Sequence, residues 1–164
     1  MTSPATYSRT QIALHWIVAL LFVLQFVLHE PIAEAWDVIE DGGTAAFNPL
    51  VAAHVAGGIL ILAFAVWRIA LRRMRGVPDL PASEGPAVRL AAHAGHMALY
   101  ALMILMPLSG TAAWFGGIEA AAEGHETIKP LVILLVAVHV AAALWHQIWR
   151  RDGLMRRMSL RANR

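Results

Sequence analysis

The 164-residue chain has no cysteine, and its charged residues make up only 15% of the sequence. Without cysteine it can form no disulfide, no thiolate metal site and no covalent c-type haem link. The charged fraction is well below the about 25% that soluble domains usually carry. Hydrophobic residues instead make up 59% of the chain. The composition therefore points to a membrane protein rather than to a soluble domain.

The few charges are clustered, which leaves four long apolar segments free of them. A helix needs about 20 apolar residues to cross about 30 Å of hydrocarbon, because it rises 1.5 Å per residue. We therefore expect an all-α membrane protein in which four transmembrane helices form one bundle and a single domain over residues 1–164. The expected helices cover residues 12–28, 50–71, 90–107 and 131–149.

The charges are distributed unequally between the two sides of this predicted bundle. Only Lys129, of the 13 basic residues, falls on the side opposite the termini. By the positive-inside rule, both termini and the middle connection are predicted to be cytoplasmic. We expect the excess of basic residues to contact anionic lipid headgroups and not nucleic acid, because no strand pattern and no alternation of aromatic and basic residues is present. The other twelve basic residues are Arg9, Arg68, Arg72, Arg73, Arg75, Arg89, Arg150, Arg151, Arg156, Arg157, Arg161 and Arg164, and the opposite side carries the acids Glu30, Glu34, Asp37, Glu40, Asp41, Glu119, Glu123 and Glu126.

Histidines stand in or beside every apolar segment. An ionisable side chain in hydrocarbon is costly without a partner, and neutral imidazole is a common ligand of metals and haem iron. Fourteen residues separate His125 from His139, almost four helical turns, so both face the same way about 21 Å apart. We expect this helix to ligate two stacked haems, with His15 and His54 as opposing ligands. Depth alone also allows His54 with His139 and His15 with His146.

The order and spacing of these segments resemble the bacterial cytochrome b561 family of membrane cytochromes, which is related to the cytochrome b subunits of hydrogenases and formate dehydrogenases. The resemblance covers nearly the whole chain and implies two non-covalent haem b groups. It implies that His15 and His139 ligate the haem iron on the cytoplasmic side, and His54 and His125 the haem iron on the periplasmic side. The matching stretches are Tyr7-Ser8-Arg9-Thr10-Gln11-Ile12-Ala13-Leu14-His15-Trp16, His54-Val55-Ala56-Gly57-Gly58, His93-Ala94-Gly95-His96, Pro107-Leu108-Ser109-Gly110, His125-Glu126-Thr127 and His139-Val140-Ala141-Ala142-Ala143-Leu144 with His146.

Four further residues near the predicted cytoplasmic edge are candidates for cofactor or substrate contacts: Arg68, His93, His96 and His146. They exceed what axial ligation requires, and each is a hydrogen-bond donor or an ionisable group. We expect them to contact haem propionates or a quinone, either ubiquinone or menaquinone. The alternative is that they face lipid headgroups. His29, which follows an apolar run, is predicted to be a solvated helix end.

The predicted function is respiratory electron transport in the bacterial inner membrane, by a multi-pass protein that exchanges electrons between the quinone pool and a periplasmic donor or acceptor. Two imidazoles on one iron leave no open position, so such a haem carries electrons. One alternative is a superoxide:ubiquinone oxidoreductase, but the eight outer acids should repel superoxide and favour a cationic protein such as a c-type cytochrome. More remote alternatives are a His-box di-metal enzyme and a non-redox transporter or anchor. A homodimer is left open.

Overall fold

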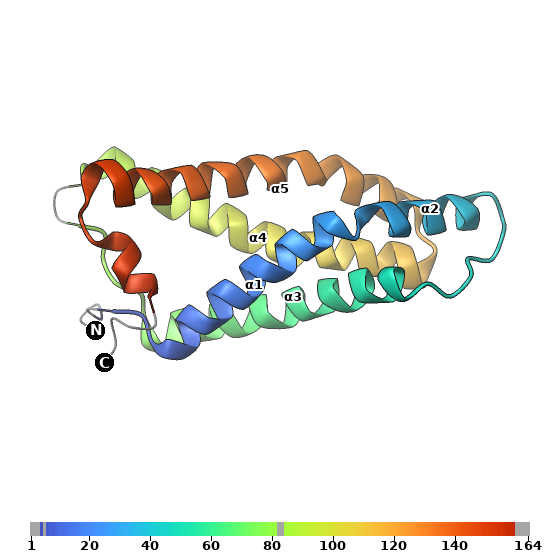
Figure 1. Cartoon of the computed structure of the whole chain (residues 1–164), viewed down its shortest axis with the longest axis horizontal. Coiled ribbons are helices and arrows are strands. Elements are labelled where there is room, and N and C mark those ends of the chain that lie inside the picture. The colour runs from blue at the N-terminus through green and yellow to red at the C-terminus, as the bar shows by residue number, and fades with distance from the viewer. Residues whose placement is uncertain (1–3, 5, 82–83, 160–164) are drawn as a thin grey trace.

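The computed structural model describes residues 4, 6–81 and 84–159. Within these residues the chain is all-helical, and four of its helices are long and apolar enough to cross a membrane (Figure 1). The fold is therefore an all-α membrane bundle, as predicted. The elements are α1 (Arg9–Val27), α2 (His29–Glu40), α3 (Pro49–Arg75), α4 (Pro86–Gly116), α5 (Glu119–Trp145), the π-helical turn η1 (His146–Arg150) that continues α5, and the 3-10 turn η2 (Leu154–Met158).

Local sequence signals explain where the long helices begin and end. The Ser8 hydroxyl accepts from the Gln11 N–H while the Gln11 side chain accepts from the Ser8 N–H, a capping box that starts α1. The Asn48 side chain caps α3, and Pro49 fits the first turn, where its missing N–H costs nothing. At the end of α4, Gly117 adopts the left-handed conformation with φ of 62°.

The helices α3, α4 and α5 begin or end well beyond the predicted ranges, whereas α1 begins three residues and ends one residue before its predicted range. The connection expected over residues 108–130 is instead the last turns of α4 and the first turns of α5, joined by a tight turn at Gly117. Pro107 and Pro130 both lie inside helices, which membrane helices tolerate because neighbouring side chains satisfy backbone groups. The connection between the first two expected helices contains α2, a helix too short to cross a bilayer.

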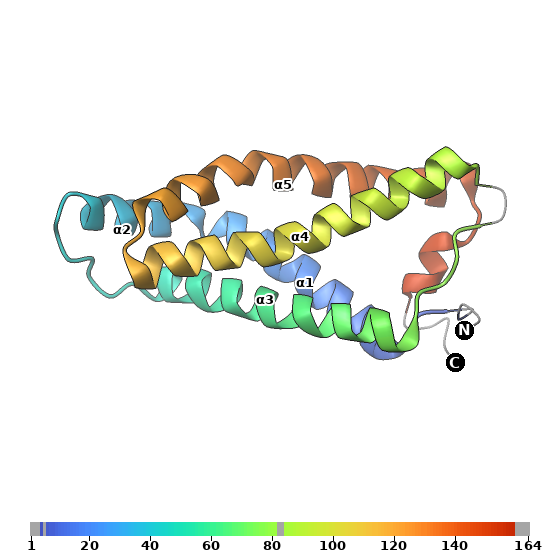
Figure 2. The same ribbon diagram turned by 180° about the vertical axis from the view of Figure 1, so that it is seen from behind.

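The helices pack so that α4 lies between α3 and α5, and α1 packs mainly against α3 (Figure 2). The buried centre is formed by Val18, Ile61, Ala65 and Met103, which come from α1, α3 and α4. In contrast, α5, which is described throughout, supplies only Val132 as a buried residue. This helix is therefore attached along α4 and does not share the central apolar cluster.

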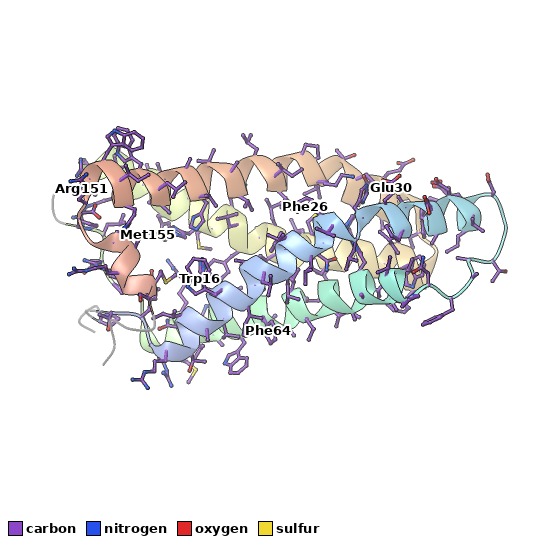
Figure 3. All side chains as sticks on the ribbon, in the orientation of Figure 1. Trp16, Phe26, Glu30, Phe64, Arg151 and Met155 are labelled. Atoms are coloured by element: carbon purple, nitrogen blue, oxygen red, sulfur yellow. The ribbon has the colours of Figure 1, made fainter. Side chains whose placement is uncertain are left out.

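The start of α1, the end of α3 and the η2 turn meet at one end of the bundle, which we call the basic end. The Trp16 indole donates to the Met158 carbonyl at 3.0 Å, and the Gln11 amide donates to the Gly76 carbonyl at 3.1 Å. Figure 3 shows Arg151 at this end and Glu30 on α2 near the other, which we call the acidic end. The charge separation predicted from the sequence is thus present in space, although Arg161 and Arg164 lie outside the described residues.

Candidate functional site

Three helices bring histidine rings together in the half of the bundle nearer the basic end. The ring centroids of His15 on α1 and His139 on α5 lie 6.2 Å apart, with the ring planes at 58°. His96 on α4 meets the same His139 ring edge-on, with centroids 5.4 Å apart. Trp16 packs edge-on against His15 at 5.2 Å. The structure therefore gathers three of the predicted site histidines at one level.

Arg68 points from α3 to this histidine level and not to the lipid surface. Its guanidinium donates to Nδ1 of His15 at 3.3 Å and to the Leu14 carbonyl at 3.5 Å. It also lies 5.6 Å from the centre of the Tyr100 ring, and Arg72 lies 6.0 Å from the same ring. Because a guanidinium can only donate, Nδ1 of His15 is an acceptor in this contact. Arg68 is therefore held beside one of the two facing imidazoles.

His54 and His125 lie in the other half of the bundle, where both line one cavity of about 370 Å³. Residues from all five α-helices surround this space, and most of them are apolar or aromatic. Such a lining with a few polar groups is typical of cofactor sites. The lining includes Phe22, Gln25, Phe26, His29, Trp36, His54, Gly58, Met106, Gly110, Trp114, His125, Glu126, Lys129 and Val132.

The His125 ring is fixed by the sequence around Pro107 on α4. Its Nδ1 lies 2.9 Å from the Met106 carbonyl and 3.2 Å from the Ser109 hydroxyl. Because the carbonyl can only accept, Nδ1 carries the proton, and Nε2 is left with its lone pair. Gly110 leaves room for the ring, since a Cβ there would lie 3.1 Å from Cε1 of His125. A metal-ligating histidine is commonly oriented by such a second hydrogen bond.

Three buried polar atoms of the described residues have no hydrogen-bond partner, and all belong to residues that line this cavity. They are Nε2 of Gln25, Nε1 of Trp36 and Nδ1 of His54. The Gln25 backbone lies beside the His54 ring, but Nδ1 makes no hydrogen bond of standard geometry. Since buried polar groups normally have partners, this concentration marks the cavity wall as a place where a ligand is expected.

The two neighbouring glycines after His54 have different surroundings. Small residues beside a histidine ligand let a flat macrocycle approach the helix backbone, and both glycines could in principle serve this. Gly58 lines the cavity, whereas Gly57 is buried against the amide of Gln25, so that an added Cβ would collide with it. Gly57 therefore makes room for a side chain of α1, and only Gly58 faces the cavity.

His29 is part of a polar cluster in the cavity wall and not simply a solvated helix end, as its sequence position suggested. Lys129 donates to Nε2 of His29 at 2.8 Å and forms an ion pair with Glu126. Nδ1 of His29 lies 3.9 Å from the same carboxylate. Lys129, the one basic residue predicted for this end of the bundle, is therefore already paired. The sequence pattern did not indicate that Gln25, Trp36 and this cluster would line a cavity.

His146 contacts different groups from the histidines deeper in the bundle. Its Nδ1 lies 2.6 Å from Oδ2 of Asp152, and the neighbouring Glu84 carboxylate is paired with Arg150 at 2.6 Å. Glu84, His146 and Asp152 are the one group in the described part of the chain with three metal-ligand side chains close together. His93 is exposed on α4, one turn before His96.

Comparison with known proteins gives consistent matches along the chain. A family model described as prokaryotic cytochrome b561 matches residues 6–159. Cytochrome b562 of Cereibacter sphaeroides is 33% identical, over 96% of this chain and 98% of its own length. Probable superoxide oxidase CybB of Yersinia pestis is 30% identical, over 93% of this chain and 94% of its own. Cytochrome b561 homolog 2 of Escherichia coli (strain K12) is 28% identical, over 95% of this chain and 92% of its own length.

Proposed function

This chain belongs to the prokaryotic cytochrome b561 family, and from that premise we propose that it holds two b haems and exchanges electrons between the membrane quinone pool and a periplasmic partner. Membrane electron transfer by a multi-pass bacterial protein and the use of haem b follow from the family. We propose in addition the number of haems, their ligands, the quinone and the periplasmic partner. The observation that carries it is the presence of two histidine pairs at two levels, each with one member on α5.

For the haem nearer the basic end, the proposed ligands are His15 and His139. Two imidazoles on opposite sides of one iron need a centroid separation of about 6 Å, from two metal–nitrogen bonds of about 2 Å and the nitrogen-to-centre distances. The separation of 6.2 Å supports this pair. Arg68 contacts Nδ1 of His15 as a donor, whereas a histidine that ligates through Nε2 donates its Nδ1–H. Ligation would therefore require the Arg68 guanidinium to turn to another hydrogen-bond acceptor, and a haem propionate would be suited to this.

For the haem nearer the acidic end, the proposed ligands are His54 and His125. The cavity they line is apolar, and Nε2 of His125 is available because Nδ1 is bonded to the Met106 carbonyl. The unpartnered N–H groups of Gln25 and Trp36 offer donors for a propionate. These residues therefore fit the cofactor that the family implies. A haem b held there by His54 and His125 would supply one-electron transfer.

We place the basic end in the cytoplasm and the protein in the inner membrane, because basic residues collect at that end and acids at the other. Both termini are then cytoplasmic, and the cavity of His54 and His125 is on the periplasmic side. A C-terminal alkaline phosphatase fusion tests this placement. The fusion is expected to be inactive, whereas phosphatase activity would reverse the orientation.

The proposed quinone site lies near the basic end, with His93, His96, Arg68 and His146 as candidate polar contacts. A quinone carbonyl needs hydrogen-bond donors and proton access from water, beside an apolar slot for the ring. Of these residues, Arg68 and His96 contact the His15–His139 pair directly, while His146 lies with Asp152. Ubiquinone and menaquinone share the carbonyl chemistry that this site would recognise.

The test of the proposed function is anaerobic oxidation of the pre-reduced protein by a short-chain ubiquinone, followed in the haem b absorption bands. Wild-type protein is expected to transfer two electrons per chain. A His54→Ala variant, which lacks a ligand of the second haem, is expected to transfer one. Reduced protein that keeps its spectrum in the presence of the quinone would refute the link to the quinone pool.

Two periplasmic partners remain in the proposal, and the charges favour a cationic redox protein such as a c-type cytochrome. The acids Glu34, Asp37 and Glu40 are exposed on α2, so association should be fast at low salt and slow at high salt. A Glu34→Lys/Glu40→Lys variant is expected to reduce a cationic c-type cytochrome more slowly, and Asp79→Lys at the basic end serves as control. If wild type, Glu34→Lys/Glu40→Lys and Asp79→Lys all reduce the cytochrome at equal rates, a cationic cytochrome is excluded as the partner.

The second candidate is oxidation of superoxide, favoured by the relative whose name is probable superoxide oxidase CybB. The balanced reaction converts two superoxide anions, one quinone and two protons into two dioxygen molecules and one hydroquinone. Lys129, the one basic residue expected at this end of the bundle, is engaged by Glu126 and His29, which weakens the attraction of an anion. Quinone-dependent superoxide removal by purified protein, measured against the same protein without quinone, decides this role.

A further inference from the structure

After α5 the chain turns back on itself so that a carboxylate meets the last histidine of the helix. The π-helical turn η1 begins at His146, and the following turn places Arg151 at φ of 49° and Gly153 at φ of 76°. Oδ2 of Asp152 then lies 2.6 Å from Nδ1 of His146, with only 13% and 14% of the two side chains exposed. π-helical turns often occur at functional positions.

The Asp152 carboxylate is held on both oxygens. Oδ2 accepts from His146, and Oδ1 accepts from the Leu154 backbone N–H at 3.0 Å. A carboxylate on Nδ1 fixes the tautomer and orientation of an imidazole, leaves Nε2 for a substrate and stabilises the protonated ring. The hydrogen bond is therefore of the kind that prepares a histidine to donate a proton.

Other charged groups surround this pair. Glu84, from the segment before α4, lies in the same cluster but is paired with Arg150 of η1 at 2.6 Å. Arg150 also acts electrostatically on Asp152. Asp79 contributes its backbone carbonyl to Arg157 of η2. Asp152 is therefore the carboxylate in direct contact with the histidine, whereas the charge of Glu84 is offset by Arg150.

We propose that Asp152 is a positioning residue for quinone protonation and acts through His146, an inference that rests on the quinone site of the proposed function. Reduction of one quinone to a hydroquinone consumes two electrons, which haem b supplies, and two protons, one at each carbonyl oxygen. Protonated His146 donates its Nε2–H to one carbonyl oxygen and becomes the neutral imidazole that keeps Nδ1–H on Asp152. Water supplies the second proton and recharges the histidine, and hydroquinone oxidation reverses these steps.

The same three side chains, Glu84, His146 and Asp152, could in chemical terms ligate a divalent cation. In the structure the Glu84 carboxylate is paired with the Arg150 guanidinium, and the Asp152 carboxylate accepts a hydrogen bond from the His146 imidazole. The geometry favours the hydrogen-bonded pair over a metal centre. The test therefore includes added zinc, which shows whether the three side chains bind a metal ion instead.

The test compares Asp152→Asn with wild type and with Asp79→Asn, which removes a carboxylate at the same end without contact to His146. Haem content is measured first, and then the rate of short-chain ubiquinone reduction over a range of pH. Asp152→Asn is expected to keep both haems but to react about tenfold or more slowly at neutral pH. Its rate should recover as the pH falls, because a higher proton concentration replaces the help of the carboxylate. Asp152→Glu should restore part of the rate.

A double variant separates a positioning role from a general structural one. If Asp152 acts through His146, then Asp152→Asn should slow a His146→Gln protein no further. Full additivity, or a loss that is equal at every pH, overturns the proposal. Failure of the quinone site itself looks different, because His146→Gln then reacts at the wild-type rate. A wild-type rate that rises or falls with added zinc, and an Asp152→Asn rate that does not, would assign the cluster to a metal and also overturn the proposal.

Discussion

His15 and His139 face each other across the bundle with ring centroids 6.2 Å apart, while His96 approaches His139 from α4 at 5.4 Å. The smaller distance belongs to an edge-on contact at 82°, and it is shorter than the separation of about 6 Å that two imidazoles on one iron need. We therefore assign the axial role to His15 and a supporting role to His96, although both rings reach the same partner.

This assignment predicts different consequences for two substitutions at the same level. His15→Ala is expected to lose one of the two haems, because the iron would keep a single imidazole. His96→Ala is expected to retain both haems with only a small change in the spectrum. Haem content per chain and the reduced absorption bands provide the measurement. Loss of a haem in His96→Ala together with retention in His15→Ala would reverse the roles.

Gly110 predicts a sensitive position near the second haem. A Cβ at this site would lie 3.1 Å from Cε1 and 3.2 Å from Nδ1 of His125, so the ring must shift and its bond to Met106 must change. Gly110→Ala is expected to lower the content, or alter the potential, of the haem nearer the acidic end and leave the other unchanged. Gly95→Ala on the same helix is the control, because nothing lies within 4 Å of its new Cβ. Identical redox titrations for both variants would contradict this.

Much of this arrangement could be predicted from the sequence, because it depends on local helix geometry. The four membrane helices follow from the length of apolar segments, and the two levels of His125 and His139 follow from fourteen residues of helical rise. Charge distribution likewise predicted which helix ends would gather together. These features could be predicted because each depends only on residues that are close together in the sequence.

The remaining features depend on contacts between distant segments. α2 was missed because its twelve residues are too few for a membrane span, and its Trp36 gains meaning only beside the cavity. The role of Gly57 depends on where Gln25 falls on another helix. The pairing of Asp152 with His146 requires a turn that begins in a π-helix and continues through a non-glycine residue at positive φ, a conformation that sequence patterns rarely indicate.

The Asp152–His146 pair also predicts a pH-dependent contribution to stability. Burial alone would raise the pKa of the Asp152 carboxyl, but hydrogen bonds from His146 and the Leu154 N–H, with the charges of His146 and Arg150, hold that pKa below its ordinary value of 3.8. A depressed carboxyl pKa stabilises the fold above the ordinary value, and this contribution is lost as the pH falls through the lower folded value.

Asp152→Asn is therefore expected to unfold more easily than wild type at neutral pH, by about 1.5–3 kcal/mol for a charge-assisted hydrogen bond. The difference should shrink below pH 3.8 and vanish once the wild-type carboxyl is protonated. Thermal unfolding in detergent, followed by circular dichroism over this pH range, makes the measurement. A difference that is constant with pH would show that the charge of Asp152 has no part in stability.

The central claim is that two pairs of histidines each hold one b haem, and a haem count with spin-state spectroscopy on the intact protein tests it most directly. Pyridine haemochrome analysis against protein concentration is expected to give two b haems per chain. Electron paramagnetic resonance of the oxidised protein is expected to show only low-spin iron, because both axial positions are filled by imidazole. One haem per chain, or high-spin iron as the main signal, would contradict the assignment of His15 with His139 and of His54 with His125.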